Sequence, residues 1–183
     1  MRRRLLALLF FLCLSSFGLW GQAQPPQQPK LVLAIVVDQF RFDYLTRFQS
    51  DFTGGFKRLL EQGAVFTNAN YDASPTVTAV GHSTFLTGAT PALSGIVSNL
   101  WYDRTEGRTV TSVSDDKTKL LGGPQNAAGS SPARLLVSTI GDELKISGKG
   151  GKVIGISLKD RSAILPGGRK ADAAYWFDGQ SGN

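Results

Sequence analysis

Residues 31–37 read LVLAIVV, an unbroken apolar run that ends at Asp38. A half-buried strand alternates apolar and polar residues, whereas a strand that is buried on both faces is apolar throughout. The run therefore predicts a central strand of a mostly parallel sheet. A second run, KVIGISL at residues 152–158, predicts another buried strand and ends at Lys159.

Helices and turns are expected between and around these two runs. Helical spacing of apolar residues predicts helices near residues 40–48, 56–61, 78–87 and 132–144. Ser131 is expected to cap the last of these helices, with Pro132 at its first position. Strands are expected at 64–70 and 173–177, a hairpin at 102–113 and a polar loop at 114–130. This alternation predicts the α/β class, with a mostly parallel sheet flanked by helices.

The composition is that of a globular chain. Of its 183 residues, 42% are apolar and 19% are charged, which excludes disordered, collagen-like and coiled-coil chains. Its 20 lysines and arginines exceed its 14 acidic residues, so the formal net charge is +6. No basic stripe interleaved with aromatic residues is present, so we expect no nucleic-acid partner.

Residues 1–23 have the pattern of a secretory signal peptide, with a cationic start, an apolar stretch and a small-x-small cleavage site. A Pro/Gln linker at 24–30 separates it from the folded part at 31–183. We expect an exported protein, periplasmic or extracellular, without stable membrane insertion after signal cleavage; an uncleaved anchor is the alternative. The single cysteine, Cys13, lies in the signal, so the mature chain has no disulfide and no thiolate metal site.

Charged side chains follow both apolar runs. Asp38 follows the first run, and Lys159 and Arg161 follow the second. Because ligands of parallel sheets bind outside the carboxyl ends of the strands, we expect these groups on one rim of the sheet. Asp38 has two interpretations: an N-cap of the next helix, or a hard oxygen ligand for a divalent metal.

The segment SPTVT at residues 74–78 places hydroxyl groups at the expected start of a helix. A helix start attracts anions, and a hydroxyl there can act as a nucleophile if a metal ion lowers its pKa. The simpler interpretation is a Ser/Thr-rich turn. His82 is the only histidine, and we expect it to be packed or hydrogen-bonded rather than catalytic.

Several segments, in this order, resemble the N-terminal part of the alkaline phosphatase superfamily. Within it they resemble most the phosphate-irrepressible bacterial alkaline phosphatases with a threonine nucleophile, and next their type I phosphodiesterase/nucleotide pyrophosphatase relatives. The segments are VVDQ at 36–39, RFDYL at 41–45, GGFKRL at 54–59, PTVT at 75–78, GH at 81–82, TGATP at 87–91, GIVSN at 95–99 and WYD at 101–103.

The resemblance implies a zinc site and a nucleophile. Asp38 would be a zinc ligand, and Thr78 would be both a zinc ligand and the nucleophile that becomes phosphothreonine. Thr76 is the competing threonine, and the spacing to His82 favours Thr78. The implied cofactor is two Zn²⁺ ions, whose remaining ligands we expect beyond residue 183.

The resemblance also implies phosphate-ester substrates. Asn99 would bind a phosphoryl oxygen, and Lys159 and Arg161 would contact the phosphoryl group, a pair that goes with phosphate monoesters in this superfamily. The alternatives are a phosphodiesterase or nucleotide pyrophosphatase, and a metal-free exported anion-binding module. We expect the 183-residue chain to be a front part of the enzyme that is inactive alone. The sequence carries no signal for an oligomeric state.

Overall fold

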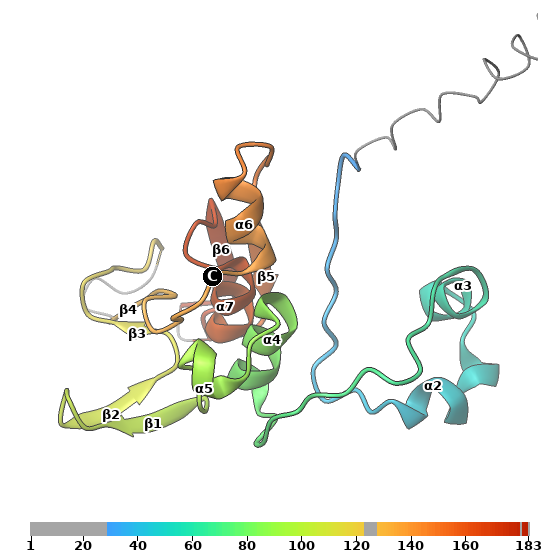
Figure 1. The fold of residues 1–183 in the computed structure, drawn as a ribbon, viewed down its shortest axis with the longest axis horizontal. Coiled ribbons are helices and arrows are strands. Elements are labelled where there is room, and N and C mark those ends of the chain that lie inside the picture. The colour runs from blue at the N-terminus through green and yellow to red at the C-terminus, as the bar shows by residue number, and fades with distance from the viewer. Residues whose placement is uncertain (1–28, 123–127, 180, 183) are drawn as a thin grey trace, which may run out of the picture. The chain divides into compact units, whose positions relative to one another are not determined.

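The computed structural model describes residues 29–122, 128–179, 181 and 182, and Figure 1 shows its ribbon. The chain divides into two compact units, Met1–Ile35 and Val36–Asn183. The expected signal peptide and most of the expected linker lie outside the described residues. All elements described below belong to the second unit. No helix in the described part of the chain has the length and hydrophobicity needed to span a bilayer.

The apolar run at residues 31–37 is not a strand in this structure. Its residues have no assigned secondary structure, and the side chain of Leu31 is 78% exposed. A strand is stabilised by hydrogen bonds to a neighbouring strand and by cover on its faces. None of the described strand pairings includes this run. The prediction of a buried central strand is therefore wrong for this structure.

An aromatic cluster organises the segment that follows Asp38. The expected helix at 40–48 is reduced to α2 (Asp43–Arg47), which a 3₁₀ turn, η2 (Gln49–Asp51), extends. Helix α3 (Gly55–Gln62) matches its prediction and ends at Gly63. The rings of Phe40 and Phe56 stack with centroids 5.2 Å apart, which ties α3 to the start of the segment. The strand expected at 64–70 does not form.

Helix α4 (Thr78–Thr87) forms as predicted and contributes Ala79 to the core. It ends at Gly88, whose left-handed backbone (φ 67°) suits glycine. The short helix α5 (Pro91–Ser94) follows; it was not predicted, because four residues are too few for a periodic pattern. Ala79 of α4 is fully buried in the core cluster, which also contains Ile96.

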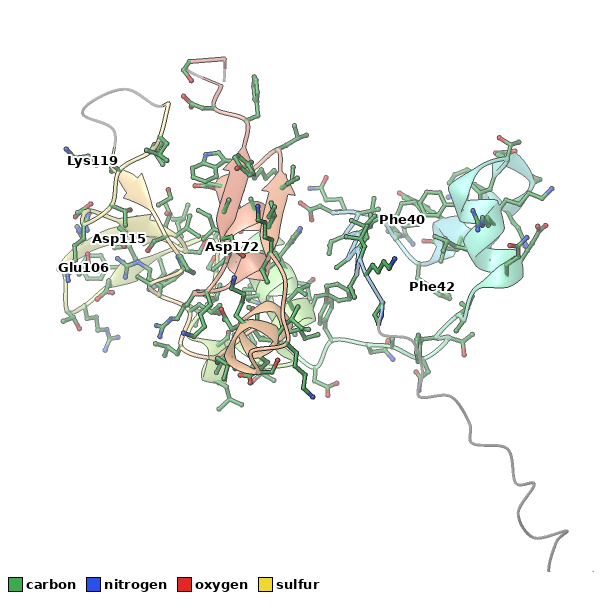
Figure 2. The ribbon with its side chains drawn as sticks, turned by 90° about the horizontal axis from the view of Figure 1, so that it is seen from above. Phe40, Phe42, Glu106, Asp115, Lys119 and Asp172 are labelled. Atoms are coloured by element: carbon green, nitrogen blue, oxygen red, sulfur yellow. The ribbon has the colours of Figure 1, made fainter. Side chains whose placement is uncertain are left out.

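The predicted hairpin is confirmed. Strands β1 (Leu100–Asp103) and β2 (Arg108–Thr111) pair antiparallel. The expected polar loop contains a further short pair, β3 (Ser114–Asp115) with β4 (Gly129–Ser130), while its residues 123–127 lie outside the described part. Arg134 braces the hairpin by ion pairs with Asp103, at 3.1 Å, and Glu106. Figure 2 labels Glu106 and Asp115, which line one shallow hollow beside this hairpin.

Helix α6 (Ile140–Ile146) starts later than predicted. Ser131 and Pro132 are followed by turns, and Thr139 is the true N-cap. Its hydroxyl accepts a hydrogen bond from the Asp142 amide at 3.0 Å, while the Asp142 carboxylate accepts one from the Thr139 amide at 2.9 Å. Both side chains of this reciprocal capping box are buried. The capping box therefore determines where the helix starts, in place of the Ser131-Pro132 pair.

A parallel strand–helix–strand unit closes the fold. Strand β5 (Ile154–Ser157), helix α7 (Asp160–Gly167) and strand β6 (Ala173–Trp176) follow one another, and β5 pairs with β6 in parallel. Ile164 and Leu165 of α7 join the same core as α4. Both strands and the α/β class were predicted; α7 was missed because Pro166 and three early polar residues obscure its period. Burial of β5 on both faces was predicted wrongly, since one face is exposed.

We predict that Thr139→Ala lowers the free energy of unfolding by about 1–2 kcal/mol, because the buried capping box loses one of its two bonds. Urea unfolding followed by circular dichroism measures this. Ser147→Ala, at the exposed other end of α6, is the control and should stay within about 0.5 kcal/mol of the unsubstituted chain. Equal losses in the two variants would contradict the assignment of Thr139 as the helix start.

Candidate functional site

Three segments that are distant in sequence meet at one carboxylate oxygen. The Thr78 hydroxyl donates a hydrogen bond to Oδ2 of Asp38 at 3.1 Å. The Lys159 ammonium donates to the same oxygen at 3.3 Å, across 121 residues of sequence. Asp38, Thr78 and Lys159 therefore form one cluster of an acid, a hydroxyl and an amine.

The backbone places Asp38 at a turn rather than at a helix start. Gln39, the next residue, has a positive φ of 61°, so the chain changes direction directly after the carboxylate. The next helix, α2, begins at Asp43 with Phe42 at its N-cap. The N-cap interpretation of Asp38 is therefore wrong.

The surroundings of Asp38 favour its ionised form. Partial burial removes water and by itself raises the pKa of this carboxyl group. The hydrogen bonds from Thr78 and Lys159, with the positive charge of Lys159, outweigh burial and hold the pKa of Asp38 below its usual value. An ionised carboxylate beside a hydroxyl is an oxygen-donor pair that suits a divalent cation.

Thr78 and Asn99 are held together by the first turn of α4. Thr78 is the first residue of the helix, and the amide of the following residue, Ala79, donates to the Asn99 side-chain oxygen at 2.9 Å. Asn99 itself directly precedes β1. This bond fixes the Asn99 side chain at the first turn of α4. Thr78, and not Thr76, is the threonine that contacts Asp38.

His82 has the structural role expected of a lone histidine. Its side chain is buried, and Nδ1 lies 2.8 Å from the Thr78 carbonyl oxygen.

Tyr71 was not singled out from the sequence, but its hydroxyl donates a hydrogen bond to the Gly81 carbonyl at 3.2 Å and joins the preceding loop to α4. Burial raises the pKa of Tyr71, so it stays a neutral donor. Nothing in the local sequence pattern marks this contact.

Arg161 lies two residues after Lys159, in the first turn of α7. Its guanidinium lies 3.6 Å from the Asp160 carboxylate, and its Nε atom is buried without a partner among the described residues. No hydrogen bond or ion pair between described residues joins Arg161 to Asp38 or Thr78. The structure therefore brings Asp38, Thr78 and Lys159 into contact, attaches Asn99 through Ala79, and leaves Arg161 beside the cluster.

The donor set for a metal ion is partial. A catalytic zinc ion takes about three protein ligands. Asp38 and Thr78 offer two oxygen atoms, and the described residues contain no group of three or more His, Cys, Asp or Glu side chains placed to hold a metal. These two residues fit one side of a metal site, and further ligands are needed to complete it.

A separate hollow of about 630 Å³ lies between β6, α7 and the loop near residue 120. Its lining includes Arg169, Asp172 and Trp176 but none of the five candidate site residues. Figure 2 labels Asp172, whose carboxylate is paired with Lys145 at 2.8 Å. This hollow is not the predicted site.

The parallel β–α–β unit defines an α/β protein, and Lys159 of the candidate cluster lies just beyond the carboxyl end of β5, at the edge where ligands of parallel sheets bind. The chain belongs to the type I phosphodiesterase/nucleotide pyrophosphatase family, which it matches over residues 32–182. Recognition of the superfamily from the sequence is thereby confirmed.

Curated relatives include alkaline phosphatases. PhoV of Synechococcus elongatus is 44% identical over 186 residues, covering 97% of this chain and 34% of its own length. PafA of Elizabethkingia meningoseptica is 44% identical over 158 residues, which cover 85% of this chain and 29% of PafA. A protein named calcium-transporting ATPase, from Myroides odoratus, is 44% identical over 173 residues, which cover 93% of this chain and 31% of that protein. The chain thus spans about a third of the length of the curated relatives it matches.

Solved structures give the same fold. The crystal structure of wild-type PafA matches with a TM-score of 0.76 at 43% identity, covering 80% of this chain and 29% of PafA. A fourfold-substituted PafA variant matches with a TM-score of 0.77 at 40% identity. The predicted alkaline-phosphatase-like α/β fold is therefore confirmed, and the chain matches part of the larger PafA fold.

We predict that Asp38→Asn and Lys159→Met each change the free energy of unfolding by less than about 1 kcal/mol, because an exposed ion pair contributes little to stability. Both side chains are at least a third exposed. Urea unfolding of the chain measures this. A loss of several kcal/mol in either variant would show that the pair is structural and would make it unsuitable for the functional tests below.

Proposed function

We propose that this chain is the N-terminal part of a zinc-dependent enzyme that hydrolyses phosphate monoesters through a phosphothreonine intermediate on Thr78. The observation that carries the proposal is the contact of the Thr78 hydroxyl with Asp38 Oδ2, at 3.1 Å, beside the Lys159 ammonium. Family membership narrows the chemistry of such a cluster to phosphoric esters. The related proteins named alkaline phosphatases support the monoester choice.

Thr78 supplies the attacking oxygen in this proposal. Asp38, held ionised, accepts the hydrogen bond of the hydroxyl and so orients its oxygen toward the substrate. The Thr78 oxygen forms a bond to phosphorus as the ester oxygen leaves, and water then releases phosphate from the threonine. The position at the start of a ten-residue helix adds a favourable field for the anionic group.

Asn99, Lys159 and Arg161 bind the transferred phosphoryl group. Asn99 offers its amide beside the first turn of α4, and the two cations follow β5 on the same edge of the sheet. Two positive charges suit the dianionic end of a monoester better than a diester. The solved PafA variant is substituted at a threonine, an asparagine, a lysine and an arginine. These are the same four residue types, which supports the choice of residues.

Asp38 and Thr78 would hold zinc from one side, with further ligands from residues outside these 183. When bound, the two ions would activate the threonine oxygen and stabilise the leaving oxygen. The Lys159 ammonium donates a hydrogen bond to Asp38 Oδ2 in this structure. If a metal ion binds that oxygen, the ammonium must move away from it to reach a phosphoryl group. The proposed enzyme is exported, periplasmic or extracellular, by the signal pattern at residues 1–23.

Two alternatives are tested alongside. A phosphodiesterase or nucleotide pyrophosphatase is favoured by the family name. A metal-free anion-binding module is favoured by the partial donor set and by the cations Lys159 and Arg161.

We predict that a chimera joining residues 1–178 of this chain to the remaining two-thirds of PafA hydrolyses p-nitrophenyl phosphate. Thr78→Ala in the chimera should lower kcat by at least about a thousandfold, because the attacking oxygen is lost. Thr76→Ala is the matched control and should retain most of the activity. A fully active Thr78→Ala chimera would overturn the nucleophile assignment.

The same chimera separates the esterase classes. We predict that Lys159→Ala and Arg161→Ala each lower kcat/KM for the monoester by about 10²–10³-fold and lower it much less for bis-p-nitrophenyl phosphate. Lys170→Ala, an exposed cation outside the site, is the control. A chimera that prefers the diester, with equal losses for both substrates, would favour the phosphodiesterase.

We predict that the 183-residue chain alone neither turns over monoesters nor binds zinc tightly, because its donor set is partial. Fluorogenic phosphate-ester assays with added zinc, and calorimetric zinc titration, measure this. Turnover that Thr78→Ala abolishes would show that the chain is sufficient. Phosphate binding by the chain that a chelator does not change would favour the anion-binding module.

A further inference from the structure

The Lys159 ammonium is held in place by a single contact. It donates to Asp38 Oδ2 at 3.3 Å, and no other hydrogen bond or ion pair between described residues involves that ammonium. The side chain of Lys159 is 46% exposed, and its four-carbon stem is flexible. The ion pair with Asp38, rather than burial in the core, therefore keeps the ammonium where it is.

The second cation of the proposed phosphate site, Arg161, is not held by Asp38. It lies in the first turn of α7, and its guanidinium lies 3.6 Å from the Asp160 carboxylate. Only Lys159 forms an ion pair with the candidate metal ligand among the described residues. The two cations therefore differ in how a ligand at Asp38 affects them.

A divalent cation and the Lys159 ammonium compete for the same side of the Asp38 carboxylate. The Thr78 hydroxyl is also hydrogen-bonded to Oδ2, at 3.1 Å. A cation that binds both oxygens must therefore approach Oδ2, where the ammonium lies. Because a dication repels an ammonium at contact distance, binding of the cation displaces Lys159 from Asp38.

We propose that the Asp38–Lys159 ion pair is an autoinhibitory contact: it keeps Lys159 from phosphate in the metal-free chain, and a divalent cation at Asp38 releases the ammonium to bind a phosphoryl anion. Because binding free energies are linked reciprocally, the cation and phosphate then favour each other's binding. An exposed ion pair of this kind changes such an equilibrium by about two- to fivefold. The inference rests on the proposed function for the identity of the two ligands, but not on Thr78 as the nucleophile.

The test is a double-mutant cycle on the 183-residue chain, titrated with inorganic phosphate in the presence of a chelator and followed by calorimetry. Asp38→Asn should tighten phosphate binding about two- to fivefold, because it releases Lys159. Lys159→Met should weaken binding about fivefold in the Asp38→Asn chain, and about twofold or less in the chain that keeps Asp38, where the ammonium is already engaged. Arg161→Met is the matched control and should weaken binding by the same factor in both chains.

The cation side of the competition is tested with Mn²⁺, whose binding is followed by the relaxation of water protons. Lys159→Met should bind Mn²⁺ about two- to fivefold more tightly than the unsubstituted chain, because no ammonium competes for Asp38. Lys145→Met removes the lysine of a separate ion pair, with Asp172, and is the control that should leave the Mn²⁺ affinity unchanged.

Circular dichroism shows whether each variant is folded, and Asp38→Ser replaces Asp38→Asn if the latter unfolds. An equal effect of Lys159→Met in both chains, or no phosphate binding by the Asp38→Asn chain, would overturn the inference. An Mn²⁺ affinity that Lys159→Met does not raise would overturn it as well. Because both readouts are binding, the expected results together with a chimera that lacks turnover would support the release of Lys159 while counting against the proposed function.

Discussion

The Oδ2 atom of Asp38 accepts hydrogen bonds from both Thr78 and Lys159, and the candidate site depends on that shared acceptor. Without it, the hydroxyl at the start of α4 and the ammonium after β5 would be separate surface groups. The charges of the cluster nearly cancel, because it contains one carboxylate and one ammonium. An incoming cation therefore competes with Lys159 for Asp38, and an incoming anion competes with Asp38 for Lys159.

The core explains why these groups can meet. Helices α4 and α7 pack against each other, and α7 lies on the β5–β6 sheet. Thr78 is at the start of α4, and Lys159 is the residue before α7, so one helix–helix contact positions both. Ala79, the residue after Thr78, is fully buried, so the core directly supports the position of the Thr78 hydroxyl. The buried core therefore positions the site, because an exposed ion pair contributes little to stability.

Sequence patterns predicted the parts of the fold that short-range chemistry determines. The hairpin, the end of α4 at Gly88 and the β5 and β6 strands each have a local signal. The start of α6 was missed because the Thr139 capping box depends on burial, which the Ser-Pro pattern at 131–132 does not show. The run at 31–37 was predicted as a strand from its unbroken apolar pattern. A strand also requires a hydrogen-bonded partner, and the partner depends on the whole sheet.

The candidate site was predicted on two different grounds. Asp38, Lys159 and Arg161 were placed on one rim by the rule for parallel sheets, and the first two do lie in contact. The choice of Thr78 came from the family resemblance, because no rule of sheet geometry selects one hydroxyl group among several in a turn.

The most direct measurement is mass spectrometry of the active chimera after acid quenching during monoester turnover. The account predicts one phosphoryl group on Thr78. A phosphoryl group on Thr76 or His82 alone, or none in a chimera that shows burst kinetics, would contradict it.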